Sequence, residues 1–148
     1  MSRGAGPGEK HSGPAGDLAQ ALAAAAADLA ERQPGRAEAR LLEALERHPE
    51  AAAAWDALGR ARNNLRRLPE AEAAFREALR HDPRLASAWN HLGHVLRATG
   101  RTDEARQTFR EGIAAAEKKG DFIPKQEMTR KLDELTLGSS ENTGNEGK

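Results

Sequence analysis

The stretch AAWDALGRA at residues 53–61 returns as SAWNHLGHV at residues 87–95, an interval of 34 residues. Both copies place a tryptophan, a leucine and a glycine at the same three positions. The same interval relates Phe75 to Phe109 and Ala71 to Ala105. A fixed period of about 20–50 residues is the signature of a stack of similar structural units. The sequence therefore predicts a repeat protein.

A third copy lies upstream and is clearest in its second half, where Ala37, Leu41, Ala44, Leu45 and Pro49 match Ala71, Phe75, Ala78, Leu79 and Pro83. The predicted repeats are about 18–51, 52–85 and 86–119. The first half of the upstream copy is ambiguous, because it is almost entirely alanine.

Two registers are open for this alanine-rich half. The strict 34-residue interval puts Asp28 at a core position. A turn one residue shorter, at Gln33–Gly35, would instead bring an apolar set to the core: Leu22, Ala25, Ala26 and Leu29. We favour the shifted register, and we expect the first unit to be the least stable because alanine buries little area.

Each unit is predicted to contain two helices that pack closely. Trp55, Leu58 and Phe75 supply the bulk, while Gly59 and Ala71 are small where the paired helix approaches. Helix-breaking stretches at 66–69 and 100–103 separate the two helices of a unit. The apolar residues are mostly alanine and aromatics are only 3% of the chain, which favours an all-α fold.

This pattern resembles the tetratricopeptide-repeat (TPR) family, whose units run W-x-x-L-G, then A-x-x-x-F-x-x-A and a closing proline. The resemblance covers residues 18–119 and implies an α-α superhelix, a TPR solenoid of about seven helices. Three positions depart from the pattern: Arg62 replaces a large apolar residue, Gly112 an alanine and Glu117 the closing proline. The last change predicts that the final repeat helix runs on.

The remaining segments frame a domain at residues 17–137. Residues 1–16 and 138–148 are rich in glycine without apolar periodicity, so we expect disordered tails. Between them, 121–137 has the spacing of an amphipathic capping helix. The residues expected to pack on the helix of Phe109 and Ile113 are Phe122, Met128, Leu132 and Leu135.

Composition argues against several classes of function. The 23 basic and 23 acidic residues cancel, which disfavours nucleic acid and anionic membranes as partners. No stretch approaches the ~18–20 apolar residues of a membrane span. The absence of cysteine excludes thiolate catalysis and is compatible with a cytoplasmic location. No catalytic, phosphate-binding or metal-ligand motif is present, and His91 with His94 alone supplies too few ligands, so we expect no enzyme, metal or cofactor.

The resemblance implies that the first helix of each unit lines the concave face, so the candidate partner-binding residues lie on its non-core side. We call this set the inner strip: Asp56, Arg60, Asn63, Asn64, Asn90, His91, His94 and Arg97. Asp56 with Arg60 and Asn90 with His94 are spaced i, i+4 and are expected to lie together. Asparagine both donates and accepts, which suits an extended peptide backbone.

A subset of the family, the adaptors that dock on chaperones, grips a C-terminal carboxylate with two lysines, two asparagines and an arginine. The matching positions here are Leu22 and Ser87, Ala26 and Ala57, and His91. None of the five is kept. We therefore expect no docking on the tails of the cytosolic heat-shock chaperones.

Three hypotheses for function follow. The first is an adaptor or scaffold that holds a protein or peptide segment in the groove. The second is a small escort of an unfolded or secreted partner, for which Leu22 or Leu29 would offer apolar surface. The third is a non-catalytic accessory subunit of an enzyme. Self-association stays open as well, since uncovered ends of repeat arrays stack.

Overall fold

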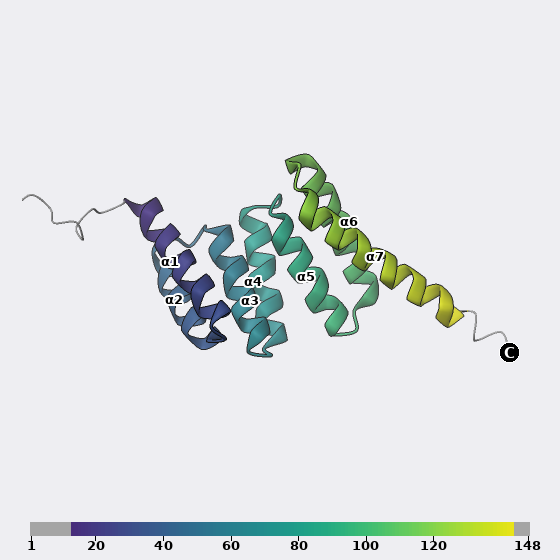
Figure 1. Cartoon of the computed structure of the whole chain (residues 1–148), viewed down its shortest axis with the longest axis horizontal. Coiled ribbons are helices and arrows are strands. Elements are labelled where there is room, and N and C mark those ends of the chain that lie inside the picture. Colours follow the sequence, from purple (N-terminus) through teal and green to yellow (C-terminus); the bar gives the residue numbers. More distant parts are fainter. Residues whose placement is uncertain (1–12, 144–148) are drawn as a thin grey trace, which may run out of the picture.

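The computed structural model describes residues 13–143, and all regular structure within that range is helical. The helices are α1 (Pro14–Ala30), α2 (Pro34–Arg47), α3 (Ala52–Asn64), α4 (Leu68–His81), α5 (Ala86–Ala98), α6 (Thr102–Lys119) and α7 (Phe122–Thr143). They stack in chain order, with α1 and α7 at opposite ends (Figure 1). The predicted all-α superhelix of seven helices is confirmed for these residues.

The packing of the helices defines an inner and an outer side. Each helix packs on the next one along the chain, and each odd-numbered helix also contacts the next odd-numbered helix. Within residues 13–143, no two even-numbered helices pack on one another, although the side chains of Arg76 on α4 and Glu104 on α6 form an ion pair at 3.7 Å. The stack therefore curves around the odd-numbered helices, which places the first helix of every unit on the concave side.

Small and large residues interlock as the sequence predicts. A Cβ atom added to Gly59 would overlap the ring of Phe75, and one added to Gly93 would overlap Phe109. Both rings are almost completely buried. One repeat apart, Trp55 and Trp89 donate from Nε1 to the carbonyl oxygens of Pro49 and Pro83, at 2.8 and 2.9 Å. These bonds attach α3 and α5 to the loops that precede them.

The turns between paired helices decide the register of the first unit. Arg32, Arg66 and Gly100 have positive φ angles of 59°, 61° and 79°, and they are spaced by the repeat interval. In each turn the N–H of the next residue donates to the carbonyl oxygen five residues back, which closes the same helix-ending loop. The first turn is thus equal in length to the others, and the favoured shifted register is wrong.

The strict register places a charged residue where the third unit has an apolar one. Asp28, Arg62 and Leu96 occupy the same position, and Asp28 is only 4% exposed. Arg40 Nε lies 2.6 Å from Asp28, and Arg62 Nε lies 3.2 Å from Glu38. The buried Asp28 and the half-buried Arg62 thus each have a partner on α2, which sequence spacing did not reveal. Of the set predicted for the core, Ala25 is buried and Ala26 is exposed.

The C-terminal end agrees with the prediction except at one residue. The sixth helix continues to Lys119 where Glu117 replaces proline, and Gly120 ends it with a φ of 75°. Met128 is fully buried, and Leu132 and Leu135 pack on the same core cluster. Phe122 was expected to join them, but it is 71% exposed because it starts α7 on the opposite side.

Both terminal helices are longer than expected. The first begins at Pro14, inside the segment predicted as a disordered tail, and the seventh ends at Thr143 rather than near residue 137. Residues 1–12 and 144–148 lie outside the described residues, so disorder there stays a prediction.

Candidate partner-binding face

The inner strip is carried by α3 and α5, two neighbouring helices of the concave side. It is not uniformly exposed: Asp56 and Asn90 are each 7% exposed, while Arg60, Asn64, His94 and Arg97 are open to solvent. Asn63 and His91 are half-buried. The strip therefore contains residues that join helices and residues that remain available to a partner.

Asp56 belongs to the first kind. Its carboxylate accepts a hydrogen bond from Ser87 Oγ at 3.0 Å and lies 2.9 Å from His91 Nδ1. The His91 ring stacks on Phe75, with 5.3 Å between ring centroids. The expected Asp56–Arg60 pair is wrong, because the carboxylate turns toward α5.

Asn90 has the equivalent role in the next repeat. Its side-chain oxygen accepts a hydrogen bond from Lys131 Nζ at 3.0 Å, and Lys131 also pairs with Glu127 at 3.1 Å. The hydrogen bond from Lys131 lowers the pKa of Glu127 below its usual range. The expected Asn90–His94 contact is replaced by this link to α7.

A further link to α7 involves Arg97, whose Nη1 lies 3.2 Å from Glu134. Although the His94 side chain is exposed, the protein around it removes part of its hydration and so lowers its pKa. The charges of Lys131, Arg97 and His91 lower the pKa further. Glu127 acts in the opposite direction. His94 therefore takes up a proton less readily than a histidine in water does.

The contribution of α7 to this face was missed from the sequence. Glu127, Lys131 and Glu134 follow one another at i, i+4 and i+7, beside the stripe of Met128 and Leu132. That polar spacing is visible in the sequence, but many exposed helices share it. Only the contacts with Asn90 and Arg97 give it a role.

Three residues of the strip on α3 stay available. The side chains of Arg60, Asn63 and Asn64 make no hydrogen bond or ion pair with any other described residue. Together they offer a guanidinium and two amides on one helix, which can donate to carbonyl and carboxylate oxygens and accept from peptide N–H groups. This chemistry suits a peptide backbone or an acidic side chain.

Other kinds of site find no support among the residues that the structure describes. Between residues 13 and 143, no three His, Asp or Glu side chains come together as a metal site would require. None of the helices there combines the length and the apolar character of a membrane span.

The fold and this polar inner face define a helical-repeat interaction module. A family model for the tetratricopeptide repeat matches residues 22–85 and 57–119. The chain belongs to the tetratricopeptide-repeat family. No curated protein matches it in sequence.

Solved structures show the same architecture. The chain is similar to the TPR2B domain of yeast Sti1 in a complex with pHsp70, with a TM-score of 0.77, 17% identity and coverage of 82% of this chain and 98% of that one. It is similar to the Sgt2 TPR domain from Aspergillus fumigatus, with a TM-score of 0.76 and 20% identity. That match covers 86% of this chain and 82% of the Sgt2 chain. The chain is also similar to the Yersinia enterocolitica type III secretion translocator chaperone SycD, with a TM-score of 0.76 and 14% identity. That match covers 83% of this chain and 86% of SycD. At these identities the likeness shows the fold alone.

Proposed function

We propose that the chain is a non-catalytic adaptor that holds a protein or peptide segment on its inner strip. The observation that carries the proposal is the set of unused polar groups on α3: Arg60, Asn63 and Asn64. They lie on the concave side, next to residues whose positions are fixed by contacts between helices. A binding face needs both available groups and a rigid support.

The solved relatives support the class of ligand. The Sti1 domain is in a complex with pHsp70, and a TPR domain of human RPAP3 is in a complex with an Hsp70 peptide. In this chain, none of the five carboxylate-gripping positions carries the family's residue, and two of them, Ser87 and His91, are turned toward Asp56. The proposal is therefore a protein segment, not a heat-shock tail.

The adaptor is favoured over the escort by the state of the apolar residues. Leu22 and Leu29 are half-buried and pack against the core cluster around Leu41 and Leu58. They leave little apolar surface for an unfolded chain. We place the adaptor in the cytoplasm within the same proposal; the absence of cysteine is compatible with that reducing compartment.

The test is affinity capture from the native lysate with two variants beside the intact protein. The strip variant changes Arg60, Asn64, His94 and Arg97 to alanine. The control variant changes Arg84 and Arg110, both exposed and away from the strip, to alanine and so loses the same two positive charges. We expect one partner to be lost by the strip variant and kept by the control.

Retention of the partner by both variants would place the binding surface elsewhere and overturn the proposal. The accessory-subunit hypothesis makes the same prediction about binding. The accessory-subunit hypothesis adds that the captured partner is an enzyme. The catalytic rate of that enzyme would fall when the strip variant replaces the intact chain.

A further inference from the structure

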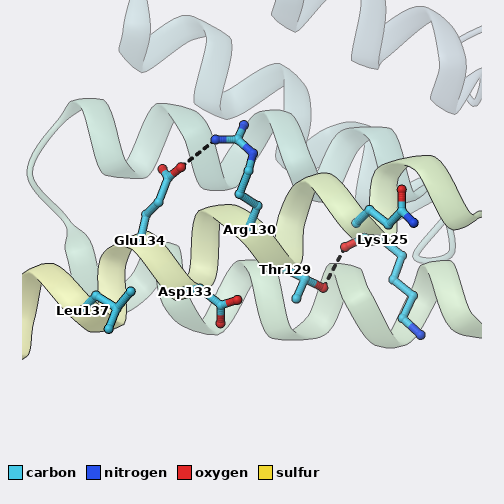
Figure 2. Close-up of a pocket in the computed structure, with 7 residues that line it drawn as sticks. Lys125, Thr129, Arg130, Asp133, Glu134 and Leu137 are labelled. Carbon is cyan, nitrogen blue, oxygen red and sulfur yellow. Dashed lines mark hydrogen bonds and ion pairs between the residues drawn. The ribbon is translucent and has the colours of Figure 1, made fainter.

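The outer face of α7 is an open surface with a mixed apolar and polar lining. It is a shallow surface formed by Lys125, Gln126, Thr129, Arg130, Asp133, Glu134 and Leu137. Figure 2 shows Thr129, Asp133 and Leu137 along the lower side of the helix and the Arg130–Glu134 pair on its upper side. Helices α3 and α5 each pack between two even-numbered helices, whereas α7 has only α6.

Large apolar residues are concentrated on this same helix. Among the described residues, the exposed large apolar side chains are Leu42, Phe122, Ile123 and Leu137, so three of the four belong to α7. Phe122 is 71% and Leu137 64% exposed. Helical periodicity puts Phe122, Gln126, Thr129, Asp133 and Leu137 on one stripe. The stripe is apolar at both ends and polar between them.

The order of residues along the stripe makes it complementary to itself. Around a midpoint between Thr129 and Arg130, Phe122 is as far on one side as Leu137 is on the other. Lys125 lies before the midpoint, and Asp133 lies after it at nearly the same distance, to within one residue. A two-fold axis at that midpoint would place apolar ends on apolar ends and Lys125 of one helix near Asp133 of the other.

We propose that this outer face of α7 is an interface between two copies of the chain, paired antiparallel about that two-fold axis. Each Phe122 packs against Leu137 of the second copy, and each Lys125 lies opposite Asp133 of the second copy. Asp133 is available for this role, since it makes no ion pair with any residue between 13 and 143. The Lys125–Asp133 contact and the Phe122–Leu137 contact would each occur twice across the interface, as an isologous interface requires.

The strength of the dimer follows from the size of the face. The stretch from 122 to 137 is about 24 Å long at 1.5 Å per residue. A single helix of that length buries less than the ~800 Å² per partner of a standard stable interface. The dimer is therefore weak and reversible. It leaves the inner strips of both copies open to solvent. A partner with two binding segments would thus be bound more tightly by the dimer than by one copy, through avidity. The proposal does not depend on what the strip binds.

A charge-swap series tests the pairing by sedimentation velocity on the full chain at concentrations up to ~1 mM. We expect K125E and D133K each to weaken dimerisation about tenfold, since the symmetry makes every change count twice. The double variant K125E/D133K restores it. Residues 125 and 133 are about two helical turns apart, so the restoration cannot come from within one chain. E117Q, which removes only the 2.9 Å Lys125–Glu117 pair, is the control and leaves dimerisation unchanged.

A cysteine placed near the two-fold axis gives a second measurement that does not depend on charge. The chain has no cysteine, so T129C would be the sole thiol and should form a disulfide-linked dimer under mild oxidation. D103C, whose side chain is 95% exposed at the start of α6, is the matched control and should stay monomeric. Helical content by circular dichroism checks that all variants are folded. A chain that stays monomeric, a dimer that K125E leaves intact, or equal cross-linking of T129C and D103C would each overturn the proposal.

Discussion

Asp56 and Asn90 lie one repeat apart, and each joins its own odd-numbered helix to the next one. Asp56 does so by accepting a hydrogen bond from Ser87 and pairing with His91 on α5. Asn90 accepts from Lys131 on α7. At the equivalent position of the first unit stands Leu22, which packs on the core. The concave side is therefore held by apolar packing at one end and by polar contacts at the other.

Removal of the Asp56 carboxylate tests the first of these contacts. We expect Asp56→Ala to lower the free energy of unfolding by about 1–3 kcal/mol, because two side chains of α5 lose their partner at a largely buried site. Arg60→Ala, one turn away on the same helix and exposed, should stay within about 0.5 kcal/mol of the natural protein. Urea unfolding followed by circular dichroism measures both.

The assignment of that loss to the His91 contact can be checked with a double-mutant cycle. If the contact is real, Asp56→Ala and His91→Ala together cost less than the sum of the two changes, by about 0.5–1.5 kcal/mol. Full additivity would show that the two residues do not interact.

The lowered pKa of His94 predicts a pH dependence of stability. The folded chain binds a proton at His94 less readily than the unfolded chain, whose histidine has a pKa of about 6.5. Stability therefore falls as the pH drops through that value, since protons favour the unfolded state. The groups that face His94 and set this effect are Lys131, Arg97, His91 and Glu127.

We expect His94→Gln to lose less stability than the natural protein when the pH is lowered from about 7.5 to about 5, because the variant lacks the group that takes up a proton on unfolding. The measurement is urea unfolding at a series of pH values. The difference between the two proteins isolates His94, because the other histidines titrate in both. An identical pH profile for the two would contradict the assignment.

The sequence is a good guide where the repeat relation applies and a poor one where a side chain reaches another element. Trp55, Phe75 and their counterparts predicted the helix pairs, and Glu117 predicted the longer sixth helix, because packing and helix termination depend on local residue type. The partner of Asp56 was predicted as Arg60 from spacing within one helix. In the structure the partner of Asp56 is His91, because the stacking of one unit on the next brings these two residues together.

The first unit shows why a sensible prediction failed. Burying Leu22 and Leu29 in place of Asp28 is favoured by transfer free energy alone, which led to the shifted register. It neglected Arg40, which pairs with the buried charge from the neighbouring helix. The shifted register placed the turn at Gln33–Gly35, whereas the turn contains Arg32, which adopts the same left-handed conformation as Arg66 and Gly100.

The close approach of paired helices predicts opposite effects for two glycine-to-alanine changes. Gly59→Ala should destabilise the chain by about 1–3 kcal/mol, because the new methyl group overlaps the buried ring of Phe75. Gly35→Ala, in the first turn of α2 with open space around it, should be neutral or stabilising by up to about 1 kcal/mol. Thermal and urea unfolding of the two variants gives the comparison, and a stabilised Gly59→Ala protein would contradict the packing.

The Asp28–Arg40 pair predicts that the two partners are not equally replaceable. Arg40→Ala leaves a carboxylate that is 4% exposed with only Arg36 nearby, at 3.7 Å, and should cost about 1–3 kcal/mol. Asp28→Leu introduces the residue type that the third unit has at Leu96, and leaves Arg40 free to reach solvent. Replacing a buried charge by a packed apolar side chain is often neutral or stabilising, so Asp28→Leu should retain or exceed the natural stability. If urea unfolding shows Asp28→Leu to be the more damaging change, then Asp28 contributes a specific contact that leucine cannot supply, and burial of the charge is not the cost that this prediction assumes.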